Sequence, residues 1–199
     1  MRRMIFILVL TMIMAVPGLS FAAKTSLEDV WIDKAQHIVV RKIAVFWVAR
    51  TSENRIMAEN EFVRQLKERG LIAMPAYVII PPDKFVEREE AVRKIQGLGV
   101  DTVLTLRPVT KLTGKSDFLK SGPPGPSDLS GYYQFVYDQP PSDSTGSVYL
   151  EAVLFDAASG IRVWAARSVT KTGDGIDPKL LQEFIGLIID RLAADKMIP

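Results

Sequence analysis

The sequence predicts an α/β domain of three layers, in which a parallel βαβαβ half continues into an antiparallel β-hairpin and a C-terminal helix packs on the sheet. Three observations carry this prediction. Three apolar runs alternate with two amphipathic helical patterns over residues 42–107, two further apolar runs flank a short turn at residues 157–160, and a helical apolar stripe follows residue 178.

Residues 1–22 have the features of a cleavable secretory signal peptide. These are a basic start, a nearly unbroken apolar run, and small residues at positions −3 and −1 of the cleavage point: Arg2 and Arg3, Met4–Val16, and Ser20 and Ala22. The apolar run is shorter than the roughly 20 residues that cross a bilayer as a helix. We therefore expect cleavage after Ala22, which leaves one mature domain over residues 23–199 in the periplasm, without a transmembrane segment.

Composition excludes several classes of protein and site. The chain contains no cysteine, which excludes a lipoprotein anchor, disulfides, thiolate catalysis and cysteine-ligated zinc. Loss of Arg2 and Arg3 with the signal peptide reduces the 25 basic residues to 23, equal to the 23 acidic residues. Because a formally neutral domain lacks the basic footprint of a nucleic-acid-binding protein, we expect no nucleic-acid partner.

The parallel half begins with the run Lys42–Ala49 (KIAVFWVA), whose continuous apolar character is typical of a strand covered on both faces. A helix follows, with a hydroxyl N-cap at Thr51 or Ser52 and with Gly70 as its left-handed stop. Its apolar stripe consists of Ile56, Phe62, Val63 and Leu66.

The second strand of this half, Leu71–Ile80, contains Pro75, which cannot donate a ladder hydrogen bond. We therefore expect this strand to be bent or to lie at an edge of the sheet. An apolar stripe predicts the second helix: Ala91, Val92, Ile95 and Leu98. Asp101–Arg107 (DTVLTLR) predicts the third strand, and the order βαβαβ predicts parallel pairing with right-handed crossovers.

Residues 110–146 are rich in proline, glycine and serine, so we expect a long loop excursion that contributes little to the fold. Four aromatic residues stand out within it: Tyr132, Tyr133, Phe135 and Tyr137. Two interpretations of them stay open. They form an exposed partner surface, since interfaces favour aromatic residues, or a short edge strand under the sheet, since the pattern alternates.

The C-terminal part predicts a hairpin and a helix. Ser147–Asp156 and Ile161–Val169 form the hairpin, with Gly160 where a positive φ is needed. Asp177 and Pro178 supply the N-cap and first residue of the last helix. Its apolar stripe consists of Leu180, Leu181, Phe184, Ile185, Ile188 and Leu192.

The three tryptophans have different expected places. Trp47 and Trp164 lie inside apolar strands and are expected in the core. Trp31 precedes the predicted domain, and we expect it to pack over an edge of the sheet.

Two stretches resemble proteins of known type. KIAVFWVARTSENRIMAENEFVRQLKERGLIAMPAY, followed by GVDTVLTLRPV, resembles uncharacterised exported proteins and lipoproteins of Gram-negative envelopes, in which an arginine and a glutamate recur early in the first helix. Here these residues would be Arg55 and either Glu59 or Glu61. VYLEAVLFDAASGIRVWAARSV resembles the hairpin of the curli-secretion CsgG family and of related penicillin-binding-protein activator lipoproteins. The resemblance implies a binding or assembly module, and the missing lipoprotein cysteine favours a free periplasmic domain.

The turn after the first strand is the one place that we expect could host a ligand. Arg50, Thr51, Ser52 and Arg55 lie where a helix begins at the carboxyl end of a central strand, a position at which α/β folds bind anions. The alternative, which we favour, is a simple N-cap with solvated arginines, because no glycine lets the backbone approach a phosphate. Arg55 and Glu59 also have the i, i+4 spacing of a helix-surface ion pair.

His37 is the only histidine, which excludes a histidine triad and a multi-histidine metal site. We therefore expect no catalytic, cofactor-binding or metal-binding residues. The sequence indicates a non-enzymatic periplasmic binding or assembly module of the cell envelope, whose partner is an envelope protein or a component of glycan assembly. The alternative is a small enzyme or an anion- or nucleotide-binding protein that uses the turn from Arg50 to Arg55.

Overall fold

A computed structural model describes residues 25–36, 38–48, 51–82, 86–109, 114–138, 147–171 and 178–199. The predicted signal peptide, His37, Arg50 and the N-cap Asp177 lie outside the described residues. Within these ranges the strands form one six-stranded sheet in the order β1-β6-β5-β4-β2-β3. The strands are β1 (Thr25–Ile32), β2 (Lys42–Trp47), β3 (Ile72–Pro75), β4 (Thr102–Val109), β5 (Ser147–Asp156) and β6 (Arg162–Lys171).

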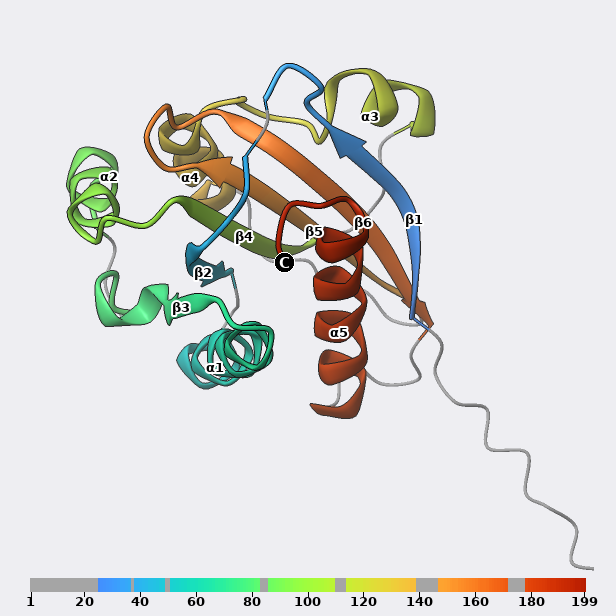
Figure 1. The fold of residues 1–199 in the computed structure, drawn as a ribbon, viewed down its shortest axis with the longest axis horizontal. Coiled ribbons are helices and arrows are strands. Elements are labelled where there is room, and N and C mark those ends of the chain that lie inside the picture. The colour runs from blue at the N-terminus through green and yellow to red at the C-terminus, as the bar shows by residue number, and fades with distance from the viewer. Residues whose placement is uncertain are drawn as a thin grey trace, which may run out of the picture.

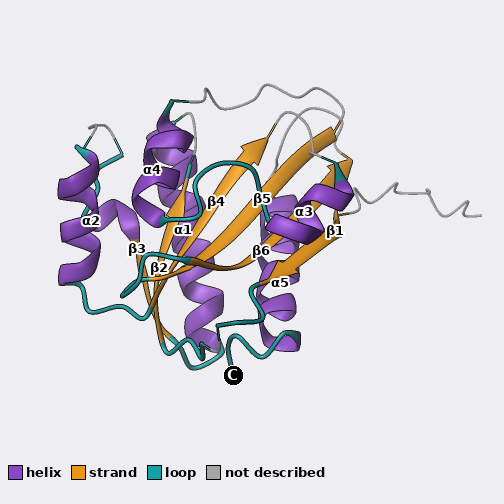
Figure 2. Ribbon diagram, turned by 90° about the horizontal axis from the view of Figure 1, so that it is seen from above, coloured by secondary structure: helices purple, strands orange, loops and turns teal. Residues whose placement is uncertain are grey.

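Helices cover both faces of the sheet and complete three layers (Figures 1 and 2). The helices are α1 (Ser52–Glu68), the 3-10 helix η1 (Ala76–Val78), α2 (Arg88–Gly97), α3 (Lys115–Ser121), α4 (Leu129–Tyr137) and α5 (Pro178–Ala194). One face carries α1 and α5, and the other carries α2, α3 and α4. The predicted α/β class is confirmed.

The parallel half has the predicted order, because β2 pairs in parallel with both β3 and β4. As expected from Pro75, β3 is an edge strand, but it is short and passes directly into η1. The N–H of Ile72 donates to the carbonyl of Arg41 at 2.9 Å, so the backbone polar groups of Ile72 point toward β2. The backbone polar groups of the alternate residues Ala73 and Pro75 therefore point to the outer edge of the sheet. Proline has no N–H to present there, which protects the edge from pairing with another strand.

The first helix begins and ends as predicted. The Thr51 side chain accepts a hydrogen bond from the N–H of Asn54 at 3.3 Å, and Gly70 has a φ of 83°. Phe62, Val63 and Leu66 are buried. Ile56, by contrast, is exposed, which corrects its predicted place in the apolar stripe.

The C-terminal hairpin and helix are confirmed. β5 and β6 pair in antiparallel fashion, and Gly160 in their turn has a φ of 71°. The sequence interpretation missed β1, which pairs antiparallel with β6 at the far edge of the sheet. Trp31 lies in this strand, and it is therefore part of the sheet instead of a residue that precedes the domain.

Each face of the sheet has its own apolar cluster. The α1 and α5 face buries Trp47, Trp164 and Phe184 among its members, so both strand tryptophans lie in the core as predicted. The α2, α3 and α4 face buries Phe46 and Phe155 together with a set of aromatic residues from the helices: Phe118, Tyr132 and Tyr133.

Residues 114–138 are more ordered than the predicted loop excursion, since they contain α3 and α4. The stretch YYQFVY is helical, which corrects its interpretation as a short strand. Asp128 caps this helix, because its Oδ1 accepts a hydrogen bond from the N–H of Gly131 at 2.7 Å. Leu129, Tyr132, Tyr133 and Val136 are buried at helical spacing. The alternating pattern of YYQFVY hides this period of three to four residues.

Candidate functional site

Arg55, in the first turns of α1, does not face solvent. The Thr51 hydroxyl serves as the N-cap, Ser52 begins the helix, and the structure does not describe Arg50. Arg55 is only 4% exposed, its Nε donates to Glu59 Oε1 at 2.7 Å, and its guanidinium carbon lies 4.6 Å from the centre of the Phe46 ring. The prediction of a solvated arginine in a surface ion pair is therefore wrong, because the pair is buried.

The carboxylate of Glu59 joins α1 to the end of β2 and to η1. It accepts hydrogen bonds from the backbone N–H of Trp47 at 3.0 Å and of Tyr77 at 2.8 Å, in addition to the bond from Arg55. Burial raises the pKa of Glu59, although Arg55 and the two N–H groups oppose this shift. Of the two glutamates suggested by the resemblance, Glu59 is the partner of Arg55, and Glu61 pairs with Arg64 on the helix surface.

A second group of buried charges crosses the opposite part of the sheet. Four residues occupy matched register positions on adjacent strands and alternate in sign: Arg107, Glu151, Arg167 and Asp29. Each is at most 7% exposed. Arg107 Nε lies 2.9 Å from Glu151 Oε1, and Arg167 Nη2 lies 2.6 Å from Asp29 Oδ2. We call these four residues the charged row.

Aromatic residues of α3 and α4 cover the charged row. The guanidinium of Arg107 lies 5.6 Å from the Tyr132 ring centre and 5.0 Å from that of Phe135. The Tyr132 hydroxyl donates to Glu151 Oε1 at 3.0 Å. Burial and this carboxylate raise the pKa of Tyr132 well above its usual value. Burial would lower the pKa of Arg107, but Tyr132 and Glu151 outweigh it and raise that pKa.

A fourth buried arginine, Arg162, lies at the start of β6. It donates to the carbonyls of Pro123 at 2.8 Å and Ser121 at 2.9 Å, and its guanidinium lies 5.2 Å from the Trp31 ring centre. Ser121 is the last residue of α3 and Pro123 follows the C-cap Gly122, so Arg162 binds the C-terminal end of that helix and the residues after it. Burial lowers its pKa.

The predicted aromatic partner surface does not face solvent as a whole. Tyr132 and Tyr133 are buried, and the Tyr133 hydroxyl donates to the carbonyl of Val86 at 3.0 Å. Phe135 is partly buried against the same cluster, and the side chain of Tyr137 lies outside the described residues. Tyr132 and Tyr133 therefore belong to the core that joins α4 to the sheet.

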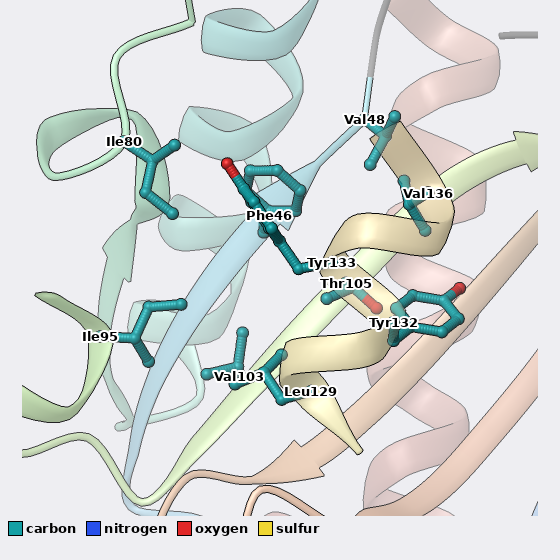
Figure 3. Close-up of a pocket in the computed structure, with 10 residues that line it drawn as sticks. All are labelled: Phe46, Val48, Ile80, Ile95, Val103, Thr105, Leu129, Tyr132, Tyr133 and Val136. Atoms are coloured by element: carbon teal, nitrogen blue, oxygen red, sulfur yellow. The ribbon is translucent and has the colours of Figure 1, made fainter. Parts of the chain in front are cut away.

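A small cavity lies between α4, α2 and the strands β2 and β4 (Figure 3). Its volume is about 10 Å³, which is room for roughly one water molecule. Its lining is apolar apart from the Thr105 hydroxyl and the tyrosines: Phe46, Val48, Ile80, Ile95, Val103, Thr105, Leu129, Tyr132, Tyr133 and Val136. A cavity of this size does not hold a substrate or cofactor in this conformation.

Arg55, Glu59 and the four residues of the charged row are thus engaged in internal contacts. Among the described residues, no three His, Asp or Glu side chains gather closely enough to hold a metal ion. Within the same ranges, no helix has the length and apolar character that crossing a membrane requires.

The charged row escaped the sequence interpretation, although a signal for it exists. Glu151 and Arg167 each lie within a mainly apolar run, VYLEAVLF and VWAARSV respectively. A charge at such a position must be paired when the strand is buried, because an isolated buried charge is costly. Which charges pair depends on strand register, and the sequence does not give that register.

No protein-family model matches the chain, and no curated protein matches it. Among solved structures, the PelC dodecamer from Paraburkholderia phytofirmans has 14% identity and a TM-score of 0.44, over 86% of this chain and 96% of the PelC chain. A variant of the same PelC dodecamer has 16% identity with the same TM-score and coverage. Lipoprotein GNA1162 from Neisseria meningitidis has 15% identity and a TM-score of 0.39, over 77% of this chain and 96% of its own. Each similarity is low in sequence and partial in structure.

Proposed function

We propose that the protein is an exported, non-enzymatic binding module of the cell envelope, which docks on an envelope protein in the periplasm, for example one that takes part in glycan assembly. The signal-peptide pattern of residues 1–22 supports export. The buried charged residues pair with one another, as Arg55 does with Glu59 and Arg167 with Asp29. These pairs support a structural role for the charges, because they join neighbouring parts of the fold.

The observation that carries the proposal is a set of exposed apolar side chains near the carboxyl ends of β2 and β3. Ile56 and Met57 on α1 are 37% and 41% exposed, and Val78 on η1 is 59% exposed. We call these three residues the α1–η1 surface. The Tyr77 hydroxyl donates to Asn60 Oδ1 at 2.8 Å, which holds η1 beside α1. Exposed apolar side chains on adjoining elements are typical of interaction surfaces.

The form of the edge strand supports side-chain docking at this place over strand addition. β3 has four residues, and Pro75 occupies an outward-facing position without a donor. A partner strand would find few backbone groups to pair with along this edge. A partner that covers Met57 and Val78 would instead bury apolar side chains, which is the main source of stability in protein interfaces.

The turn from Thr51 to Arg55 is a weaker candidate for the function. The Arg55 guanidinium does not add to an anion site at the N-terminus of α1, because it is buried against Phe46 and paired with Glu59. The carboxylate of Glu59 would also repel an anion beside Arg55.

Site-specific photo-crosslinking in intact cells tests the proposal. A photoreactive amino acid is placed at Met57 or Val78 of the exported chain, and crosslinked products are identified by mass spectrometry. Ile161 is the matched control, because it is also 41% exposed. It lies beside the β5–β6 turn, and the pairing of Asp156 with Thr102 places that turn at the amino end of β4, away from the α1–η1 surface.

We expect the Met57 and Val78 positions to crosslink to the same envelope protein and the Ile161 position not to. Identical products from all three positions, or no specific product from Met57 and Val78, would contradict the proposed docking surface.

A further inference from the structure

Sulfur atoms are few in this protein and unevenly placed. The chain contains no cysteine and seven methionines, and four of these lie within the predicted signal peptide: Met1, Met4, Met12 and Met14. Cleavage after Ala22 leaves three thioethers, those of Met57, Met74 and Met197. Because the chain offers no thiol, these thioethers are the side chains that a two-electron oxidant such as hypochlorous acid attacks most readily.

The three methionines differ in exposure. Met57 is 41% exposed on α1, whereas Met197 is 5% exposed in the apolar cluster of the α1 and α5 face. The backbone of Met197 is also fixed, since its N–H donates to the carbonyl of Leu192 at 2.9 Å and its carbonyl accepts from Val40 at 2.8 Å. Met74 of β3 is partly buried against the cluster of the opposite face. An oxidant in solution therefore reaches Met57 more easily than the other two.

The polar neighbours of Met57 on the next turn of α1 have other partners. Side chains three and four positions further along a helix lie beside a given residue, and here these are Asn60 and Glu61. Asn60 Oδ1 accepts from the Tyr77 hydroxyl at 2.8 Å, and Glu61 Oε1 accepts from Gln65 Nε2 at 2.8 Å. Neither side chain is therefore free to shield the Met57 thioether from solvent.

We propose that Met57 is a site of reversible oxidation, whose conversion to the sulfoxide prevents docking through the α1–η1 surface. This inference rests on the proposed function, because Met57 is a member of that surface. The oxidant is hypochlorous acid. Its oxygen atom is transferred to Met57 Sδ, which loses two electrons, and chlorine leaves as chloride with release of a proton. A methionine sulfoxide reductase reverses the step with two electrons from a dithiol, and the oxygen leaves as water.

Oxidation changes the docking surface and not the fold. The sulfoxide converts an apolar side chain into a polar one. A partner that covers Met57 then buries a sulfoxide oxygen beside Ile56 and Val78, whose side chains have no hydrogen-bond donor, and such burial is unfavourable. In the free protein this oxygen stays in water, because the Met57 side chain is exposed. Docking therefore weakens while the domain stays folded.

Oxidation of the purified exported protein tests the site without the partner. The folded protein is treated with limiting hypochlorous acid, and peptide mass spectrometry follows the sulfoxide at each methionine. We expect Met57 to react about tenfold faster or more than Met197, with an unchanged midpoint of urea unfolding. Methionine sulfoxide reductases with a dithiol should then restore the original mass of the Met57 peptide. Equal rates at the two residues, a lowered midpoint, or a peptide that keeps the added oxygen would overturn the inference.

Photo-crosslinking from Val78 tests the effect on docking in cells. Met57→Leu is the matched control, because leucine is apolar and similar in size but is not oxidised, and Met57→Gln imitates the polar sulfoxide. Brief treatment with hypochlorous acid should lower the yield of the crosslinked complex at least about fivefold with Met57 and leave it unchanged with Met57→Leu. Met57→Gln should show the low yield without oxidant.

The outcomes separate this inference from the docking surface on which it rests. An undiminished yield with oxidised Met57, or an equal loss with Met57→Leu, would overturn oxidation at Met57 as the control and leave the docking surface in place. No specific product from Val78 before oxidation would contradict the docking surface itself, and the inference would be rejected with it.

Discussion

Glu59 Oε1 lies 3.0 Å from the backbone nitrogen of Trp47, so a side chain of α1 completes the hydrogen bonding at the end of the central strand β2. The same carboxylate accepts from Tyr77 after β3 and from Arg55. One buried side chain thus joins the helix α1 to the end of β2 and to η1, which carries part of the α1–η1 surface.

Glu59→Ala should lower the free energy of unfolding by about 3–5 kcal/mol, because it leaves the Arg55 charge buried without a counter-ion and two backbone donors without acceptors. Urea denaturation measures this loss. Glu61→Ala is the matched control on the same helix. Its partner Arg64 is half exposed, so the loss should stay within about 1 kcal/mol. Similar losses for the two variants would contradict the joining role of Glu59.

The raised pKa of Glu59 predicts a pH dependence of stability. The folded state holds the Glu59 proton more tightly than the unfolded state, so the contribution of this group is greatest below its ordinary pKa of 4.5. It declines as pH rises from there through the raised pKa of the folded protein. Glu59→Gln does not titrate. Its free energy of unfolding, relative to that of the unmodified protein, should therefore increase as pH rises above 4.5. A difference that stays constant or falls with pH would show that the carboxylate is not destabilised by burial.

The Asp29–Arg167 pair should behave as a buried ion pair whose partners depend on each other. Asp29→Leu alone should cost about 3–5 kcal/mol, because Arg167 then stays buried without its carboxylate. Combined with Arg167→Met, the cost should fall close to zero. A double-mutant cycle in urea measures the coupling, and additive losses would show that the two side chains do not act as a pair.

Trp164 anchors the hairpin on the face that α5 covers. It is fully buried, and its Nε1 donates to Asp195 Oδ2 at 2.8 Å. Trp164→Ala should lower the free energy of unfolding by about 3–5 kcal/mol. Trp31→Ala, in the edge strand β1, should cost less, because that side chain is only partly buried. A reversed order in thermal or urea unfolding would contradict the assigned core.

The elements that could be predicted from the sequence are those with an unambiguous hydrophobic pattern and an unambiguous terminating residue. The apolar run of β2 predicts a strand buried on both faces. Gly70 predicts the end of α1, and Gly160 predicts the hairpin turn. In each case the structure that the local sequence favours is also the one that packs in the folded domain.

Two elements could not be predicted because their local signals conflict with their packing. Charged and hydroxyl side chains make up half of β1 (TSLEDVWI), a composition that does not predict a strand. The strand forms nevertheless, and its Asp29 side chain pairs with the buried Arg167. The stretch YYQFVY fits a strand period as well as a helical one, and the cap at Asp128 together with contact to the sheet decides for the helix.

The buried charges were the least predictable part of the candidate site. The i, i+4 spacing of Arg55 and Glu59 is visible in the sequence, but their burial depends on β2 and η1. The charged row combines residues from four strands, and residues 29 and 167 are paired only because β1 returns to β6. Such long-range register is a property of the whole sheet.

The most direct test of the proposed function compares Val78→Asp with Ile161→Asp in cells that carry a photoreactive residue at Met57. Both substitutions place a charge on an exposed apolar position, so both should leave the unfolding midpoint nearly unchanged. We predict that Val78→Asp reduces the yield of the specific crosslinked complex about tenfold or more, since burying an unpaired charge weakens an interface by at least about 1.4 kcal/mol. Ile161→Asp should leave the yield as it is. An undiminished yield with Val78→Asp, or an equal loss with Ile161→Asp, would contradict docking through the α1–η1 surface.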